Sequence, residues 1–114
     1  MIEFRNLTKK RIRTKIFKKL GNKIFPKQFE LSVVFAPSSV IKALNKRYLN
    51  KNKPANTLSF LLERRRGEIF LNAKEQKLPF LFVHSALHLL GFNHKRNEDT
   101  KKMKERELKI LKSK

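Results

Sequence analysis

Cysteine is absent from this 114-residue chain, so neither a disulfide framework nor a thiolate-based structural metal site is available. A long hydrophobic run is also missing. The most apolar stretch, residues 78–92, contains Pro79 and two histidines and is too short to span a bilayer. The N-terminus becomes basic without the apolar core of a signal peptide. We therefore expect a cytoplasmic protein without a membrane segment.

Acidic residues are scarce, and this leaves a strong positive charge. Nine Asp and Glu stand against 29 Lys and Arg, which gives a formal net charge of +20 at pH 7. Such a surface attracts polyanions, of which nucleic acid is the most common. An anionic membrane is the competing partner, because basic amphipathic helices also lie on lipid. A merely solvated basic surface is the third interpretation.

No internal repeat or low-complexity linker divides the chain, so we expect one domain over residues 1–114. Strand patterns occur at residues 1–6, 29–36, 57–62 and 68–71. Helical patterns occur at residues 8–20, 38–48 and 77–90 and after Asn97, with Gly21 ending the first helix and Ser38 or Ser39 capping the second. The predicted fold class is α+β. It is a single domain with a small mixed sheet of three to four strands packed against about four helices, and with a metal site at the end of a central helix.

The apolar residues of the last helix, and most aromatic residues, are expected in the core. Met103, Leu108, Ile110 and Leu111 are predicted to supply the apolar contacts of that helix. Phenylalanine is able to stack on nucleic-acid bases, but most of the ten phenylalanines lie at positions that require a core. We expect at least eight of them to serve packing.

All three histidines fall within eleven residues. His84 and His88 are four apart and project from one helix face, one turn from each other. Gly91 allows the chain to leave the helix, so His94 can return to the same ion. Three neutral imidazoles leave a tetrahedral zinc with one open position, as in catalytic sites. The alternative, two core histidines and one surface histidine, does not account for this register, and we predict one zinc ion per chain.

Ser85 separates this segment from the metzincin proteases. Their pattern H-E-x-x-H-x-x-G-x-x-H matches the three histidines and Gly91, but Ser85 replaces the glutamate that acts as general base. A metalloprotease is therefore the weakest hypothesis. A bound metal that acidifies water and acts as a Lewis acid still permits hydrolysis of a phosphodiester.

Three separated segments resemble those of one family, the YbeY endoribonucleases. HSALHLLGFNH at residues 84–94 is similar to the family pattern H-G-x-L-H-L-x-G-[YF]-D-H. LNKRYLNKNKPANTLSF at residues 44–60 is similar to L-N-x-x-Y-R-G-K-D-K-P-T-[DN]-V-L-S-F, and GEI at residues 67–69 is similar to the short strand G-[DE]-I. The resemblance implies that His84, His88 and His94 are the zinc ligands. It also implies cleavage of single-stranded RNA, rather than DNA, in maturation of the 3′ end of small-subunit ribosomal RNA and in ribosome quality control.

The expected substrate contacts come from the same segments. Lys51 and Lys53 match lysines of the family, and Ser59 lies on a strand expected beside the metal helix. Arg64, Arg65 and Arg66 form the tip of a predicted hairpin, and guanidinium groups pair phosphate oxygens bidentately. Beyond a zinc-bound water, the sequence identifies no catalytic group.

The chain departs from the family pattern at several positions. Leu49 stands where the family has an arginine, Ser85 replaces a glycine, Asn93 replaces an aspartate, and the hairpin at residues 60–67 is short. An amide at Asn93 is a weaker partner for a ligand imidazole than a carboxylate. Leu49 favours an alternative function, a ribosome-assembly protein that binds RNA and has a structural metal and weak or no catalysis.

Overall fold

The computed structural model describes residues 1–91 and 97–112, and of residues 97–100 the backbone alone. These residues form four strands and four helices. In chain order they are β1 (Ile2–Asn6), α1 (Lys15–Ile24), β2 (Glu30–Ala36), α2 (Ser38–Leu49), β3 (Thr57–Glu63), β4 (Arg66–Asn72), α3 (Leu78–Leu89) and α4 (Asn97–Lys112). The α+β class and the mixed sheet predicted from the sequence are confirmed.

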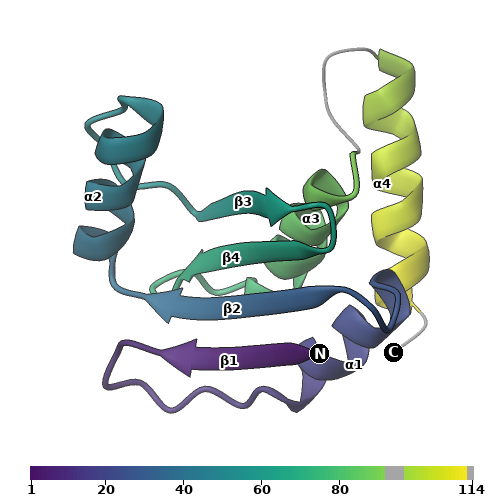
Figure 1. The fold of residues 1–114 in the computed structure, drawn as a ribbon, viewed down its shortest axis with the longest axis horizontal. Helices are drawn as coiled ribbons and strands as arrows, with labels where there is room; N and C mark the ends of the chain where they lie inside the picture. Colours follow the sequence, from purple (N-terminus) through teal and green to yellow (C-terminus); the bar gives the residue numbers. More distant parts are fainter. Residues whose placement is uncertain (92–96, 113–114) are drawn as a thin grey trace.

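The strands form one sheet in the order β1-β2-β4-β3 (Figure 1). Both β1 and β4 run parallel to β2, whereas β3 pairs with β4 as an antiparallel hairpin. The pairing shifts register between Leu61 and Glu63, just before the hairpin turn. β2 is an interior strand, as its Val- and Phe-rich sequence predicts, and β1 and β3 are the edges of the sheet.

The two faces of the sheet are covered unequally. Leu31, Val33 and Phe35 of β2 belong to the large core formed with α1, α3 and α4, whereas Val34 and Ala36 alternate with them and pack on the side of α2. In Figure 1, α2 accordingly stands apart from the other three helices. Because α2 covers only part of its face, the rest of that face stays open.

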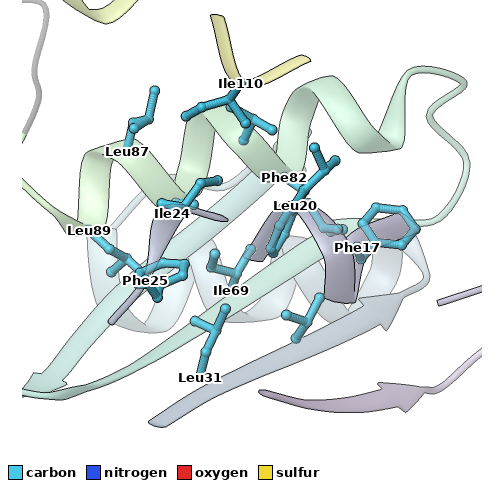
Figure 2. Packing of buried hydrophobic residues seen from close by; sticks show 14 of the residues in the cluster. Phe17, Leu20, Ile24, Phe25, Leu31, Ile69, Phe82, Leu87, Leu89 and Ile110 are labelled. Atoms are coloured by element: carbon cyan, nitrogen blue, oxygen red, sulfur yellow. The ribbon is translucent and has the colours of Figure 1, made fainter. Parts of the chain in front are cut away.

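Among the described residues of the four helices, those of α3 include the largest share of buried side chains. Helix α3 contacts the sheet, α1 and α4, and Phe82, Val83, Ala86, Leu87 and Leu89 are buried. Figure 2 shows its Phe82 close to residues of α1. A helix that is apolar almost all round must be buried, and each buried Phe, Val or Leu side chain contributes about 1.5–3 kcal/mol when removed from water. The position of α3 is therefore strongly determined.

The start of α1 differs from the prediction. It begins at Lys15 rather than at residue 8, because the side chain of Asn6 organises the preceding loop. Asn6 Oδ1 accepts hydrogen bonds from the amide of Thr8 at 2.9 Å and from its hydroxyl at 2.7 Å, and Asn6 Nδ2 donates to the carbonyl of Lys10 at 2.7 Å. These local bonds satisfy the backbone without a helical turn.

The end of α1 was also predicted wrongly, at Gly21. The helix continues to Ile24, and Gly21 is buried at a close approach to β1 and α3. A Cβ atom placed there would collide with the side chain of Ile2 and lie 3.4 Å from the ring of Phe82. Glycine at this position allows the close approach of Ile2 and does not reverse the chain.

Neither serine proposed as the cap of α2 makes a capping hydrogen bond. The cap residue is Pro37, and Ser38 is already helical. The hydroxyl of Ser38 instead accepts a hydrogen bond from the buried side-chain amide of Asn72, at 3.0 Å. Asn97, proposed as the cap of the last helix, has a side chain outside the described set.

The packing role expected for at least eight phenylalanines is confirmed. Among the nine whose side chains are described, five are buried and three are partly buried, and Phe92 lies outside the described residues. The ninth, Phe80, is 43% exposed. Met103 and Ile110 are buried as expected, but the prediction for Leu108 is wrong, because this side chain is 55% exposed beside Phe80 in a surface hollow.

No helix in the described part of the chain is both long and apolar enough to cross a membrane.

Replacing Gly21 by leucine should destabilise the fold, because a Cβ atom there displaces the side chain of Ile2 and contacts the ring of Phe82. Overpacking of this kind costs about 1–3 kcal/mol. The control is Asn22→Leu, an exposed neighbour on the same helix, where we expect a change within about 0.5 kcal/mol. Urea unfolding followed by circular dichroism measures both. Equal stability of the two variants would contradict the packing described for Gly21.

Candidate functional site

Two histidines occupy the part of α3 that the core leaves open. His84 and His88 are half-buried, one turn apart, whereas most of the residues around them on the helix are buried. Their Nε2 atoms are 3.1 Å apart and their ring centroids 4.7 Å apart. The pair thus points its ring nitrogens at one place, as the spacing of four residues predicts.

The distance between these nitrogens suits one metal ion. Zinc binds histidine nitrogen at about 2.0–2.1 Å, so two nitrogens 3.1 Å apart subtend roughly 100° at the ion, close to a tetrahedral angle. The third expected ligand, His94, lies outside the described residues. Within those residues, no group of three or more acidic or histidine side chains is placed to hold a metal.

A buried carboxylate contacts the ring nitrogen of His84 that is not directed at His88. Oε1 of Glu107, on α4, lies 2.7 Å from Nδ1 of His84, and Glu107 is only 4% exposed. Because a carboxylate only accepts hydrogen bonds, Nδ1 carries the proton, and Nε2 is left with a lone pair on the side of His88. Carboxylates commonly orient metal-binding histidines in this way and increase their basicity.

Glu107 is the functional candidate that the sequence prediction missed. The prediction sought a partner for the imidazoles at Asn93, next to the last expected ligand, and that residue lies outside the described set. A signal was nevertheless present. Met103, Glu107 and Ile110 recur at helical spacing on the buried face of α4, and a lone glutamate in an apolar stripe requires a buried partner.

Ser85 faces the sheet and not the histidines. It is 2% exposed, and its hydroxyl oxygen lies 2.6 Å from that of Thr57 on β3. Both hydroxyls are thereby satisfied, and the bond ties α3 to the edge strand. Ser85, at the position of the glutamate general base in the metzincin pattern, therefore makes a structural hydrogen bond.

A hollow of about 480 Å³ opens beside His84. Its walls come from the loop before β3, from the first half of α3 and from α4. The lining residues are Asn56, Thr57, Phe80, Leu81, His84, Lys104, Glu107 and Leu108. Most of this surface is apolar, and Lys104 and the two polar side chains at residues 56 and 57 supply hydrogen-bonding groups.

The lysines and the serine predicted as substrate contacts lie on elements that lead to this hollow. Lys51 and Lys53 are exposed in the loop that runs from α2 to Asn56. Buried Asn45 fixes this loop by donating a hydrogen bond to the carbonyl of Lys53 at 2.9 Å. Ser59 is two residues beyond Thr57 on β3, so it faces the side of α3.

The three arginines of the hairpin do not line this hollow. Arg64 and Arg65 form the turn, six residues of strand or about 20 Å along β3 from Thr57. Arg66 lies 3.6 Å from the carboxylate of Glu63, and it lines a different hollow, of about 270 Å³. That hollow also contains Glu3, Glu30, Ser32, Leu62 and Glu68. The structure does not bring these arginines to the hollow beside His84.

Comparisons with known proteins agree on one family. The family model described as "Endoribonuclease YbeY" matches residues 2–76 and 64–114. Proteins of that name from Pelagibacter ubique and Magnetococcus marinus are 35% and 36% identical to this chain; the first match covers 94% of the chain and 90% of the relative, and the second 72% and 76%. A solution structure from Thermotoga maritima has the same fold, with a TM-score of 0.64 at 24% identity over 97% of this chain and 87% of the other.

The family match thus extends beyond the region from Leu44 onward in which the sequence patterns are similar, and it includes β1, α1 and β2. It also includes both described histidines and Glu107. On this agreement of sequence and fold, the chain belongs to the YbeY family.

Proposed function

We propose that this protein is a zinc-dependent endoribonuclease that cuts single-stranded RNA in the cytoplasm and acts as one domain. Its substrate would be ribosomal RNA, with maturation of the 3′ end of the small-subunit RNA and ribosome quality control as its roles. Membership of a family whose members carry the name endoribonuclease supports the reaction class. The observation that carries the proposal for this chain is the convergence of two Nε2 atoms beside a hollow, with a carboxylate behind one of them.

Zinc would be held by His84, His88 and His94, one ion per chain. When bound, it would supply a Lewis acid for the phosphate and a water of lowered pKa. Glu107 would keep His84 in the tautomer whose unprotonated Nε2 is available to the metal. The hydrogen bond between Glu107 and Nδ1 would strengthen as the imidazole becomes more positive on binding zinc. Within the described residues, His84 and Glu107 are the titratable groups that line the hollow together with Lys104.

The charge of the chain favours RNA over a peptide as substrate. A net charge of +20 favours a polyanion, and Lys51 and Lys53 are exposed in the loop that leads to Asn56 at the hollow. Ser59 would offer its hydroxyl as a hydrogen-bonding group to the RNA strand. The hydrogen bond between Ser85 and Thr57 gives no support to a protease, because no general base replaces the missing glutamate there.

The second candidate function is a ribosome-assembly protein that binds RNA with little or no catalysis. Leu49 favours it, since this side chain is half-exposed at the end of α2 and carries no charge where the resemblance implies an arginine. RNA binding that weakens steeply with salt, without metal-dependent cleavage in nuclease-free preparations, would support this function against the first.

Replacement of His88 by alanine should abolish both bound zinc and RNA cleavage, because it removes one of the two converging nitrogens. Elemental analysis and cleavage of a single-stranded RNA oligomer measure the two effects on one sample. Binding of RNA should persist within a few-fold, since the basic surface is unchanged, and this serves as the control for folding. Full cleavage by metal-free His88→Ala would refute the proposal.

Replacement of Glu107 by glutamine should weaken zinc binding about 10- to 100-fold, because a neutral amide supports the imidazole less than a carboxylate. Competition with a chromophoric chelator measures the affinity independently of activity. Glu105→Gln, an exposed change of the same kind on α4, is the matched control and should leave the affinity unchanged. Equal zinc affinity in both variants would remove Glu107 from the site.

A further inference from the structure

Phe80 stands between two hollows. The hollow beside His84 shares Asn56, Phe80 and Leu81 with a second one, of about 510 Å³, whose other walls are Lys74, Glu75, Gln76 and Lys77. The two hollows therefore adjoin each other across the start of α3. Together they form a groove that begins at His84 and ends in the lysine-bearing loop between β4 and α3.

The ring of Phe80 belongs to the same stripe of α3 as the histidines. Residues 80, 84 and 88 follow one another at intervals of four, so they lie along one line of the helix surface. The rings of Phe80 and His84 are nearly parallel, with centroids 6.3 Å apart and an interplanar angle of 26°. Phe80 remains 43% exposed, and Leu108, which lines the same hollow, is 55% exposed. An aromatic ring and an apolar wall are thus open to solvent next to the proposed metal site.

An exposed apolar hollow in a chain with a net charge of +20 favours a ligand that is both apolar and anionic. Single-stranded nucleic acid combines these properties, because each nucleotide carries a flat base and a phosphate. The groove offers counterparts to each part. Phe80 and Leu108 present apolar surface, Asn56 has an amide able to bond a base edge, and Lys74 and Lys77 carry positive charge in the second hollow.

We propose that Phe80 is a base-stacking residue of this groove, which seats one RNA base beside His84 while Lys74 and Lys77 bind the phosphates of the strand on the other side of Phe80. The proposal rests on the proposed RNA function. It adds a physical reason why single-stranded RNA would be preferred to duplex RNA. A base in a duplex is stacked on both faces, so it cannot lie on Phe80, whereas an unpaired base can.

The test is RNA binding in the presence of a chelator, so that its result does not depend on metal or on cleavage. A fluorescently labelled single-stranded RNA oligomer is titrated with the wild-type chain, with Phe80→Ala and with Phe80→Trp. We expect Phe80→Ala to weaken binding on the order of ten-fold, and Phe80→Trp to retain it, since tryptophan also stacks. Leu62→Ala removes a side chain of similar exposure outside both hollows and should have no effect.

A second set of oligomers identifies the base itself. One abasic site is moved along the strand, and at one position it should weaken wild-type binding while scarcely affecting Phe80→Ala, because the two changes remove the same contact. Duplex RNA should bind both proteins equally. Equal binding of single strands by wild type and Phe80→Ala overturns the proposal, as does an equal loss for single-stranded and duplex RNA. If Phe80→Ala has the expected effect but the wild-type protein cleaves no RNA with zinc present, the proposed role of Phe80 is supported and the endoribonuclease function is refuted.

Discussion

The enclosure of α3 is the constraint on which the rest of the structure depends. The sheet, α1 and α4 cover this helix on most sides, and its burial fixes both its position and its rotation. One stripe, residues 80, 84 and 88, is left toward solvent. Because the helix cannot turn about its axis without exposing its core side chains, the ring nitrogens of His84 and His88 and the ring of Phe80 keep their directions.

The link between His84 and Glu107 joins this rigid helix to α4 through a polar bond inside an apolar contact. A buried carboxylate is costly unless it is paired, so the docking of α4 and the orientation of the imidazole depend on each other. The hydrogen bond from Ser85 to Thr57 plays a similar part on the other side, where it ties α3 to the edge strand. Polar bonds to two different elements therefore hold the site-bearing half of the helix.

Much of the fold was predictable because its signals are local. The alternation of β1, the two histidines one turn apart and the apolar run of α3 are all patterns within one element. The errors at Gly21 and at the start of α1 have a different origin. Gly21 is explained by contacts with residues 2 and 82, and the loop before α1 by side-chain bonds of Asn6, neither of which propensity describes.

The candidate site was predictable only in part, for the same physical reason. The spacing of His84 and His88 is a property of one helix, but Glu107 reaches His84 across 23 residues of chain, and only the packing of α4 on α3 brings them together. Likewise, the sequence does not distinguish Phe80 from the phenylalanines of the core, since its exposure depends on where the loop before β3 ends and where α4 lies. The arginine tip has the right chemistry for phosphate, yet its residues do not line the hollow beside His84.

The carboxylates of Glu3, Glu30 and Glu68 are gathered around one hollow on the open part of the sheet, on the face opposite to the helix that carries His84 and His88. In a chain with so few acids, this makes the surface charge uneven. An approaching polyanion is repelled by that patch and attracted by the lysine-rich remainder, so the molecule experiences a torque as well as an attraction. At physiological salt the torque acts only within about 8–10 Å, which is the last stage of an encounter, when a turn of the protein still decides which face touches first.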